Sequence, residues 1–157
     1  MPVYLITLHT YGRWLPDRGP GYVRRDRDGV QARDAGMANS YRTQMGGDAV
    51  LLTDEQRRVV IEVLRDTAKK TELRLYAVAV ETTHVHILVG WRDASEWSAV
   101  RGSIKRSMTL GLNKRFGPKT WWARGGSRRR VRNRSHFDEL AERYLPGHSL
   151  CWREGDP

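Results

Sequence analysis

Two alternating apolar runs, only two residues apart, constrain the fold of this chain more than any other feature. Residues 73–81 (LRLYAVAVE) alternate as a half-buried strand does, and residues 84–91 (HVHILVGW) form a second apolar run. Thr82 and Thr83 alone separate the two runs, which predicts an antiparallel β-hairpin. The turn holds neither Gly nor Asn, so its type stays open. We therefore expect an antiparallel sheet that contains this hairpin.

The other strand and helix signals alternate along the chain and indicate one fold class. Strands are expected at residues 3–10, 120–123 and 128–131, the last two as a second hairpin. Helices are expected from a Thr53–Gln56 capping box to about residue 70, over 95–115, and over 135–145 with Ser135 as the cap. This order predicts an α+β, ferredoxin-like (RRM-like) antiparallel sheet with helices packed on one face.

The length and composition indicate a single domain. The 157 residues suffice for one core, so we expect one domain over residues 1–157 with a long loop at about 11–50. The sequence contains no run of about 18 apolar residues, so a membrane span is not expected. The first residues do not resemble a secretory signal. The single cysteine, Cys151, excludes a disulfide or a Cys-based zinc site within one chain, and the expected location is a reducing cytoplasm.

Positive charge is concentrated in one segment. The chain has 28 Lys and Arg against 18 Asp and Glu, a formal net charge of +10. Twelve of the basic residues, and no acidic residue, lie between Arg101 and Arg134. The simplest interpretation is a solvated basic face. A stretch this basic that also contains Trp121 and Trp122 instead favours binding to nucleic acid through the release of counterions.

His84-Val85-His86 is the main chemical signal in the sequence. Residues i and i+2 of a strand point to the same face, so both imidazoles project together while Val85, Ile87 and Val89 face the core. A slip of one residue in the register would bury both histidines, which fixes this arrangement. Two neighbouring imidazoles form half of a divalent metal site, and two surface histidines on an open sheet face are the alternative.

A metal site needs a further ligand, and His148 is the first candidate. Tyr144 and His148 are four residues apart, so on a helix they would share a face. A Pro-Gly pair falls between them, so either His148 lies on the exit turn of the helix or its spacing from Tyr144 is accidental. His136 and His9 are the alternative ligands.

Together these features resemble the single-tyrosine HUH transposases, which include the small insertion-sequence transposases and the REP-associated tyrosine transposases. The resemblance rests on the H-x-H strand, the helix and basic hairpin that follow it, and a last helix that carries Tyr144. It extends to residues 11–16 (YGRWLP) and 121–127 (WWARGGS), and so covers most of the chain. Thr82-Thr83 stands where relatives have Pro-Asn or Pro-Asp before the first histidine.

The resemblance implies an enzyme that nicks single-stranded DNA and transfers strands through a 5′-phosphotyrosine intermediate. Tyr144 resembles the nucleophile, and His84, His86 and His148 resemble the ligands of a divalent metal, Mg²⁺ or Mn²⁺. Imidazole ligands suit Mn²⁺ better than Mg²⁺. Single-stranded or hairpin DNA is the implied substrate and a homodimer is the implied assembly. No nucleotide cofactor is expected, because the freed 3′-hydroxyl of a strand can reverse the step.

DNA contacts are expected mainly from the basic segment. Its lysines and arginines would contact phosphates, which position a strand without reading its sequence. Three tryptophans would stack on unpaired bases, with one of the adjacent pair facing inward and the other outward. The expected contact residues are Arg101, Lys105, Arg106, Arg124, Arg128, Arg129, Arg130, Trp14, Trp121 and Trp122.

Two other functions fit part of this pattern. A catalytically inactive module that binds single-stranded or hairpin DNA would keep the fold and the basic segment without the chemistry. An unrelated metal hydrolase would need a cluster of carboxylates near the H-x-H motif, and the sequence holds none there.

Overall fold

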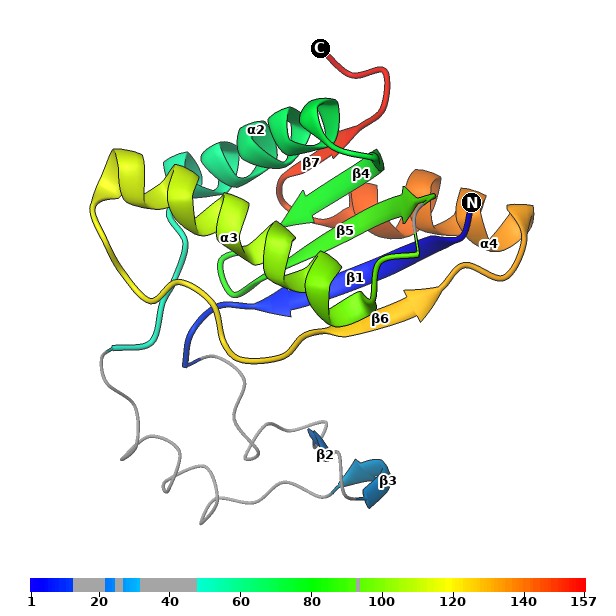
Figure 1. The fold of residues 1–157 in the computed structure, drawn as a ribbon, viewed down its shortest axis with the longest axis horizontal. Coiled ribbons are helices and arrows are strands. Elements are labelled where there is room, and N and C mark those ends of the chain that lie inside the picture. Colours follow the sequence, from blue (N-terminus) through cyan, green and yellow to red (C-terminus); the bar gives the residue numbers. More distant parts are fainter. Residues whose placement is uncertain (13–21, 25–26, 32–47, 93) are drawn as a thin grey trace.

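An antiparallel sheet of five strands forms the centre of the computed structural model, which describes residues 1–12, 22–24, 27–31, 48–92 and 94–157. The strand order is β6-β1-β5-β4-β7, and all four neighbouring pairs are antiparallel (Figure 1). The five strands are β1 (Val3–His9), β4 (Leu73–Val80), β5 (His84–Trp91), β6 (Ser127–Arg130) and β7 (Cys151–Arg153). A separate two-stranded sheet contains β2 (Tyr22–Arg24) and β3 (Arg27–Gln31).

Helical segments lie between the strands of the five-stranded sheet along the chain. They are α2 (Asp54–Lys70), α3 (Trp97–Phe116), α4 (Arg134–Glu139), the π-helical turn η1 (Leu140–Tyr144) and the 3₁₀ turn η2 (Leu145–Gly147). None of the helices described is long and apolar enough to cross a membrane. The expected loop at about 11–50 falls largely outside the described residues.

Local sequence signals set the ends of two helices. The Thr53 hydroxyl accepts a hydrogen bond from the backbone N–H of Gln56, and the Gln56 side chain accepts one from the backbone N–H of Thr53, so the predicted capping box is confirmed. The cap of α4 is Asn133 and not Ser135. The Asn133 side-chain oxygen accepts the backbone N–H of His136, which starts the helix one residue earlier than expected.

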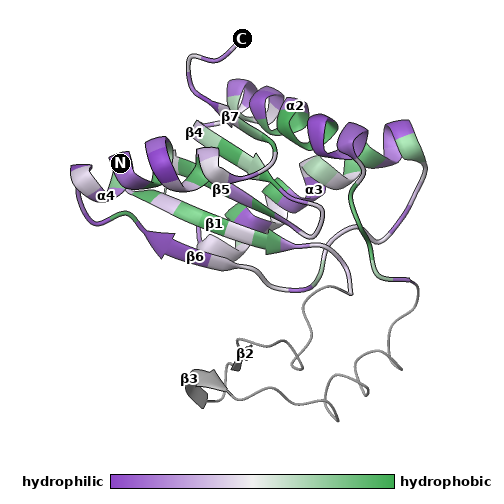
Figure 2. Ribbon diagram, turned by 180° about the vertical axis from the view of Figure 1, so that it is seen from behind, coloured by the Kyte–Doolittle hydropathy of each residue, from purple (hydrophilic) through white to green (hydrophobic). Residues whose placement is uncertain are grey.

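Helices cover both faces of the sheet. On one face, Ile6, Leu8 and Ile87 are fully buried in a core that includes Ile104 and Met108 of α3. The hydropathy colouring in Figure 2 shows the apolar strands between the α2–α3 layer and the terminal segment, which consists of α4, η1 and η2. The α+β class and the antiparallel sheet are therefore confirmed.

The expectation of helices packed on one face holds for α2 and α3, but the terminal segment lies on the opposite face. Leu140 and Leu145 of the terminal segment are buried against the opposite face of the sheet. They pack there with Leu5, Ala79 and Leu88. The terminal segment lies there because β1, β4 and β5 carry apolar or small side chains on both faces, and the second face needs a cover.

The second predicted hairpin does not form. β6 pairs with β1 along the edge of the sheet, and Trp122 makes an isolated bridge with Thr10. The two tryptophans are both buried, which anchors residues 121–122 in the α2–α3 core. The Nζ of Lys105 donates hydrogen bonds of 2.5 Å to the carbonyls of Ala123 and Gly125, and this holds the chain as it turns toward β6.

Candidate metal and tyrosine site

The register of β5 directs two histidines away from the α2–α3 core. His84 pairs with His9 of β1, and His86 pairs with Thr7. The side chains that alternate with the histidines, Val85 and Ile87, are completely buried on the other face. The predicted division of this strand into a histidine face and a core face is therefore confirmed.

The terminal segment returns His148 to this histidine face. The backbone changes from α-helix to the wider η1 turn and then to the tight η2 turn, and His148 follows directly after η2. The Nδ1 of His148 lies 3.0 Å from the carbonyl oxygen of Tyr144 and 3.1 Å from that of Leu145. His148 thus lies on the exit turn of the helix, which was one of the two interpretations of its spacing from Tyr144.

His84, His86 and His148 form a cluster whose ring nitrogens all lie within 4.8 Å of one another. The ring centroid of His86 lies 4.7 Å from that of His84 and 4.9 Å from that of His148. The Tyr144 hydroxyl lies 3.3 Å from the Nε2 of His86, and its side chain is 44% exposed. A single chain therefore brings together three imidazoles and an accessible phenol.

The protein engages the Nδ1 of each imidazole in the cluster. The Nδ1 of His86 is 2.8 Å from the Thr7 hydroxyl, and that of His84 is 3.0 Å from the Thr83 hydroxyl. The Nδ1 of His148 is within reach of two carbonyls, which can only accept, so it carries the proton. Contacts of this kind orient the rings of metal-binding histidines and select the tautomer.

His86 is held neutral by its surroundings. Burial of the ring, together with smaller contributions from the neighbouring His84, His148 and His9, lowers the pKa of His86 to about 3. A divalent ion binds the neutral form of imidazole. At neutral pH His86 is already neutral, so it would not have to lose a proton in order to bind a metal ion.

A contact that the sequence analysis missed fixes the chain immediately after His148. The Glu81 carboxylate accepts hydrogen bonds from the backbone N–H and the hydroxyl of Ser149, at 2.7 and 2.9 Å. Arg57 of α2 donates to the same hydroxyl at 2.5 Å. The one signal in the sequence that could have indicated this contact is the place of Glu81, directly after β4 and beside the hairpin turn.

Replacing Glu81 by glutamine is expected to destabilise the protein at pH 7 by about 1 kcal/mol, because a charged acceptor of two hydrogen bonds is lost. The hydrogen bonds from Ser149 lower the pKa of Glu81 in the folded state. The carboxylate therefore stabilises the fold above the pKa of the unfolded chain, and this contribution disappears as the pH falls through the folded pKa. Urea unfolding of both proteins at pH 7 and pH 4 measures the difference, which should narrow at pH 4.

The exposed Glu142 of η1 provides the control for this experiment. Glu142→Gln should change the stability by less than about 0.5 kcal/mol. A difference between wild type and Glu81→Gln that is equally large at both pH values contradicts a role for the ionised carboxylate.

The remaining candidate ligands and tyrosines are placed differently. The ring of His9 lies 5.8 Å from that of His84, next to the cluster but not among its three members. His136 is buried in α4, where its Nδ1 accepts the backbone N–H of Arg132. Tyr76 packs edge-on against Phe137. Within the described residues, the group suited to a metal is the one formed by the three histidines.

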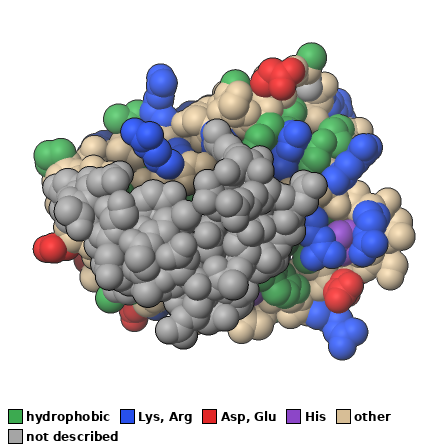
Figure 3. All heavy atoms as spheres, turned by 90° about the horizontal axis from the view of Figure 1, so that it is seen from below, with side chains coloured by type: hydrophobic (Ala, Val, Ile, Leu, Met, Phe, Trp, Pro, Cys, Tyr) green, Lys and Arg blue, Asp and Glu red, His purple; other side chains and the backbone are tan. Residues whose placement is uncertain are grey.

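Most of the expected DNA contacts from arginine are exposed. Arg106, Arg124, Arg128, Arg129 and Arg130 are exposed, and Arg101 is half-buried. Lys and Arg side chains are visible at several places on the face of the molecule drawn in Figure 3. Trp14 lies outside the described residues.

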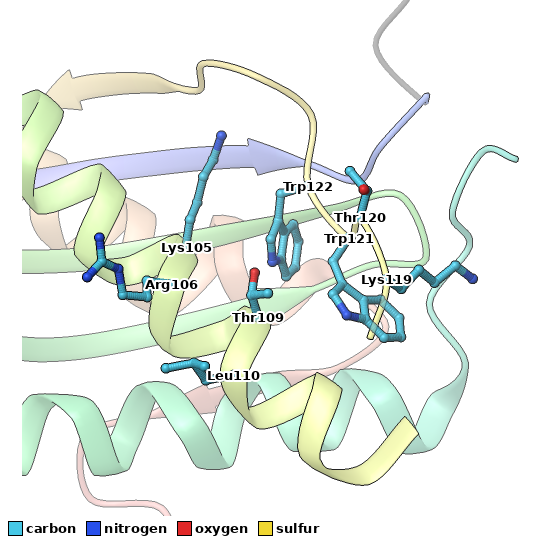
Figure 4. Close-up of a pocket in the computed structure, with 8 residues that line it drawn as sticks. All are labelled: Lys105, Arg106, Thr109, Leu110, Lys119, Thr120, Trp121 and Trp122. Atoms are coloured by element: carbon cyan, nitrogen blue, oxygen red, sulfur yellow. The ribbon is translucent and has the colours of Figure 1, made fainter. Parts of the chain in front are cut away.

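Three residues expected to contact DNA, Lys105, Trp121 and Trp122, are buried or hydrogen-bonded within the protein instead. Trp121 and Trp122 are only 2% and 8% exposed, so the expectation that one of them faces outward is wrong, and neither can stack on a base in this conformation. Figure 4 shows both indoles beside α3, with Lys105 directed toward the chain that follows them. Burial lowers the pKa of Lys105 to about 8 while its amine holds two carbonyls.

Comparisons with known proteins identify the family and the fold of the chain. The family model described as IS200-like transposase matches residues 46–144, which is more than half of the chain. A transposase structure from Deinococcus radiodurans R1 is similar to the chain, with a TM-score of 0.52, 16% identity, and 94% of this chain and 92% of that one covered. That similarity establishes the fold.

A second solved structure, a REP-associated tyrosine transposase bound to a REP hairpin, has a TM-score of 0.47 and 16% identity. It covers 92% of this chain, and the chain spans 64% of that protein's length. No curated protein matches the sequence. The match to the family model over most of the sheet and up to Tyr144 is decisive, and the chain belongs to the family of IS200-like transposases.

Proposed function

We propose that this protein is a metal-dependent enzyme that nicks single-stranded DNA and transfers strands through a 5′-phosphotyrosine intermediate. The observation that carries the proposal is the hydroxyl of the exposed residue Tyr144, which lies 3.3 Å from the Nε2 of His86 in a cluster of three imidazoles. Membership of the IS200-like transposase family supports the same reaction class.

The three histidines fit a divalent metal. Their donor nitrogens lie within 4.8 Å of one another, His86 is buried, and the protein engages Nδ1 of each ring. Three imidazoles suit Mn²⁺ better than Mg²⁺, which prefers oxygen ligands. When bound, a divalent ion supplies Lewis-acid polarisation of the scissile phosphate.

Tyr144 would act as the nucleophile. Its phenolic oxygen gives up a proton and forms a bond to phosphorus, while the bond from phosphorus to the 3′ oxygen of the neighbouring nucleotide breaks. That 3′ oxygen leaves with a proton as a 3′-hydroxyl, and the phosphate stays joined to Tyr144 at the 5′ end of the other fragment. A 3′-hydroxyl can reverse the step, so no nucleotide cofactor is needed.

Single-stranded or hairpin DNA is the substrate that we propose. The segment between Arg101 and Arg134 holds twelve basic and no acidic residues, and most of its arginines are exposed. Their contacts with phosphates would hold a strand without reading its sequence. The homodimer expected from the resemblance stays a prediction, since one chain supplies all four side chains of the candidate site.

Incubation with labelled single-stranded DNA and Mn²⁺ tests the proposal. The expected result is a covalent protein–DNA adduct that survives denaturation, is absent in EDTA, and maps to the peptide that contains Tyr144 by mass spectrometry. Binding of DNA without an adduct under any divalent metal would instead identify a DNA-binding module on the same fold.

A further inference from the structure

We propose that Arg129 positions the DNA strand at the histidine cluster, whereas its neighbours Arg128 and Arg130 face the opposite side of the sheet and serve only to hold DNA. This inference rests on the proposed function. It assigns different tasks to three adjacent arginines that look equivalent in the sequence.

The register of the edge strand separates these side chains. Directly paired residues of antiparallel strands point to the same face. Arg129 pairs with Leu5, and Ser127 pairs with Thr7. Leu5 is buried against Leu140 of the terminal segment. Arg129 therefore projects from the face that carries the histidines and the terminal segment.

The other two arginines project from the α3 face. Arg128 pairs with Ile6, a fully buried residue of the α2–α3 core, and Arg130 pairs with Tyr4. The Arg128 guanidinium also lies 5.4 Å from the centroid of the Tyr4 ring and 5.5 Å from that of Trp97. These contacts with aromatic rings on the α3 side agree with the register and place Arg128 away from the cluster.

A strip of sheet leads from the cluster to Ser127 on β6, two residues from Arg129 on the same face. His86, Thr7 and Ser127 occupy one row across β5, β1 and β6, and the side chain of Thr7 hydrogen-bonds His86. Neighbouring strands are about 4.8 Å apart, so the row spans about 10 Å from His86 to the edge. Small hydroxyl side chains on Thr7 and Ser127 leave this strip open to an extended DNA strand that runs from the cluster to the edge.

Arg129 has the chemistry that such a position requires. It is exposed, it stands next to Ser127 on the same face, and no ion pair joins it to the described residues. A guanidinium can bind a phosphate through two parallel hydrogen bonds, which fixes direction as well as distance. A contact of this kind beside the reacting phosphate orients the strand for attack by Tyr144.

The experiment compares Arg129→Gln with Arg130→Gln, which remove the same charge from adjacent positions. Single-turnover adduct formation is measured over a range of concentrations of single-stranded DNA. Arg130→Gln is expected to raise the half-saturating concentration about three-fold and to lower the saturated rate less than two-fold. Arg129→Gln is expected to lower the saturated rate at least about ten-fold. Arg129→Lys should restore part of that rate.

A binding measurement separates this inference from the proposed function. In a Tyr144→Phe background, which cannot form the adduct, Arg129→Gln should reduce the gain in DNA affinity caused by Mn²⁺ at least about three-fold. Arg130→Gln should weaken binding equally with and without Mn²⁺. Equal effects of the two variants in both experiments overturn the inference. If the wild type forms no adduct, the proposed function fails, and the binding comparison alone decides the role of Arg129.

Discussion

Replacing Tyr144 by phenylalanine is expected to abolish formation of the covalent protein–DNA adduct, with a loss of at least about 10³-fold in rate. The substitution removes only the hydroxyl that lies 3.3 Å from His86. The ring is 44% exposed, so the variant should fold normally and retain DNA binding. Denaturing gel electrophoresis of labelled DNA measures the adduct, and fluorescence anisotropy measures the binding.

Tyr76→Phe is the matched control, because Tyr76 lies on β4 against Phe137 of α4 and not in the histidine cluster. It should form the adduct at the wild-type rate. An adduct that persists in Tyr144→Phe and disappears in another tyrosine variant would assign the nucleophile elsewhere in the chain.

Replacing His86 by alanine is expected to weaken Mn²⁺ binding by at least about 100-fold, even without DNA. His86 is the buried member of the cluster, and it lies between Thr7 on one side and Tyr144 on the other. Its loss leaves two imidazoles, too few to hold the ion tightly. Isothermal titration calorimetry measures the affinity, and adduct formation should fall in parallel.

His136→Ala tests whether this loss is specific to the cluster. His136 is also buried, at 8% exposure against 7% for His86, but it belongs to the cap of α4. We expect this variant to be less stable and still to bind Mn²⁺ with the wild-type affinity. Equal affinities in wild type and His86→Ala would remove the metal site from the proposal.

The parts of the fold that depend on neighbouring residues could be predicted from the sequence. The Thr53 capping box and the hairpin around Thr82-Thr83 depend on spacings of a few residues. The same holds for the division of β5 into a histidine face and a core face, since the side chains of a strand alternate.

Residues 120–131 show why local patterns were insufficient elsewhere. The segments on either side of the glycine turn both look like strands, yet Trp121 and Trp122 are buried in the α2–α3 core and do not pair with β6. The open edge of β1 was available to β6 instead. Burial of the tryptophans also removed them from the expected DNA contacts.

The sequence by itself determined that two imidazoles share one face of a strand, because the alternation of that strand admits a single register with a dry core. Only the tertiary structure decided that Tyr144 and His148, about sixty residues later, reach this face. The same is true of Arg129, which is separated from Arg128 and Arg130 by its pairing with Leu5. These placements depend on which apolar surfaces remain uncovered once the sheet has formed, and residues distant in the chain settle that together.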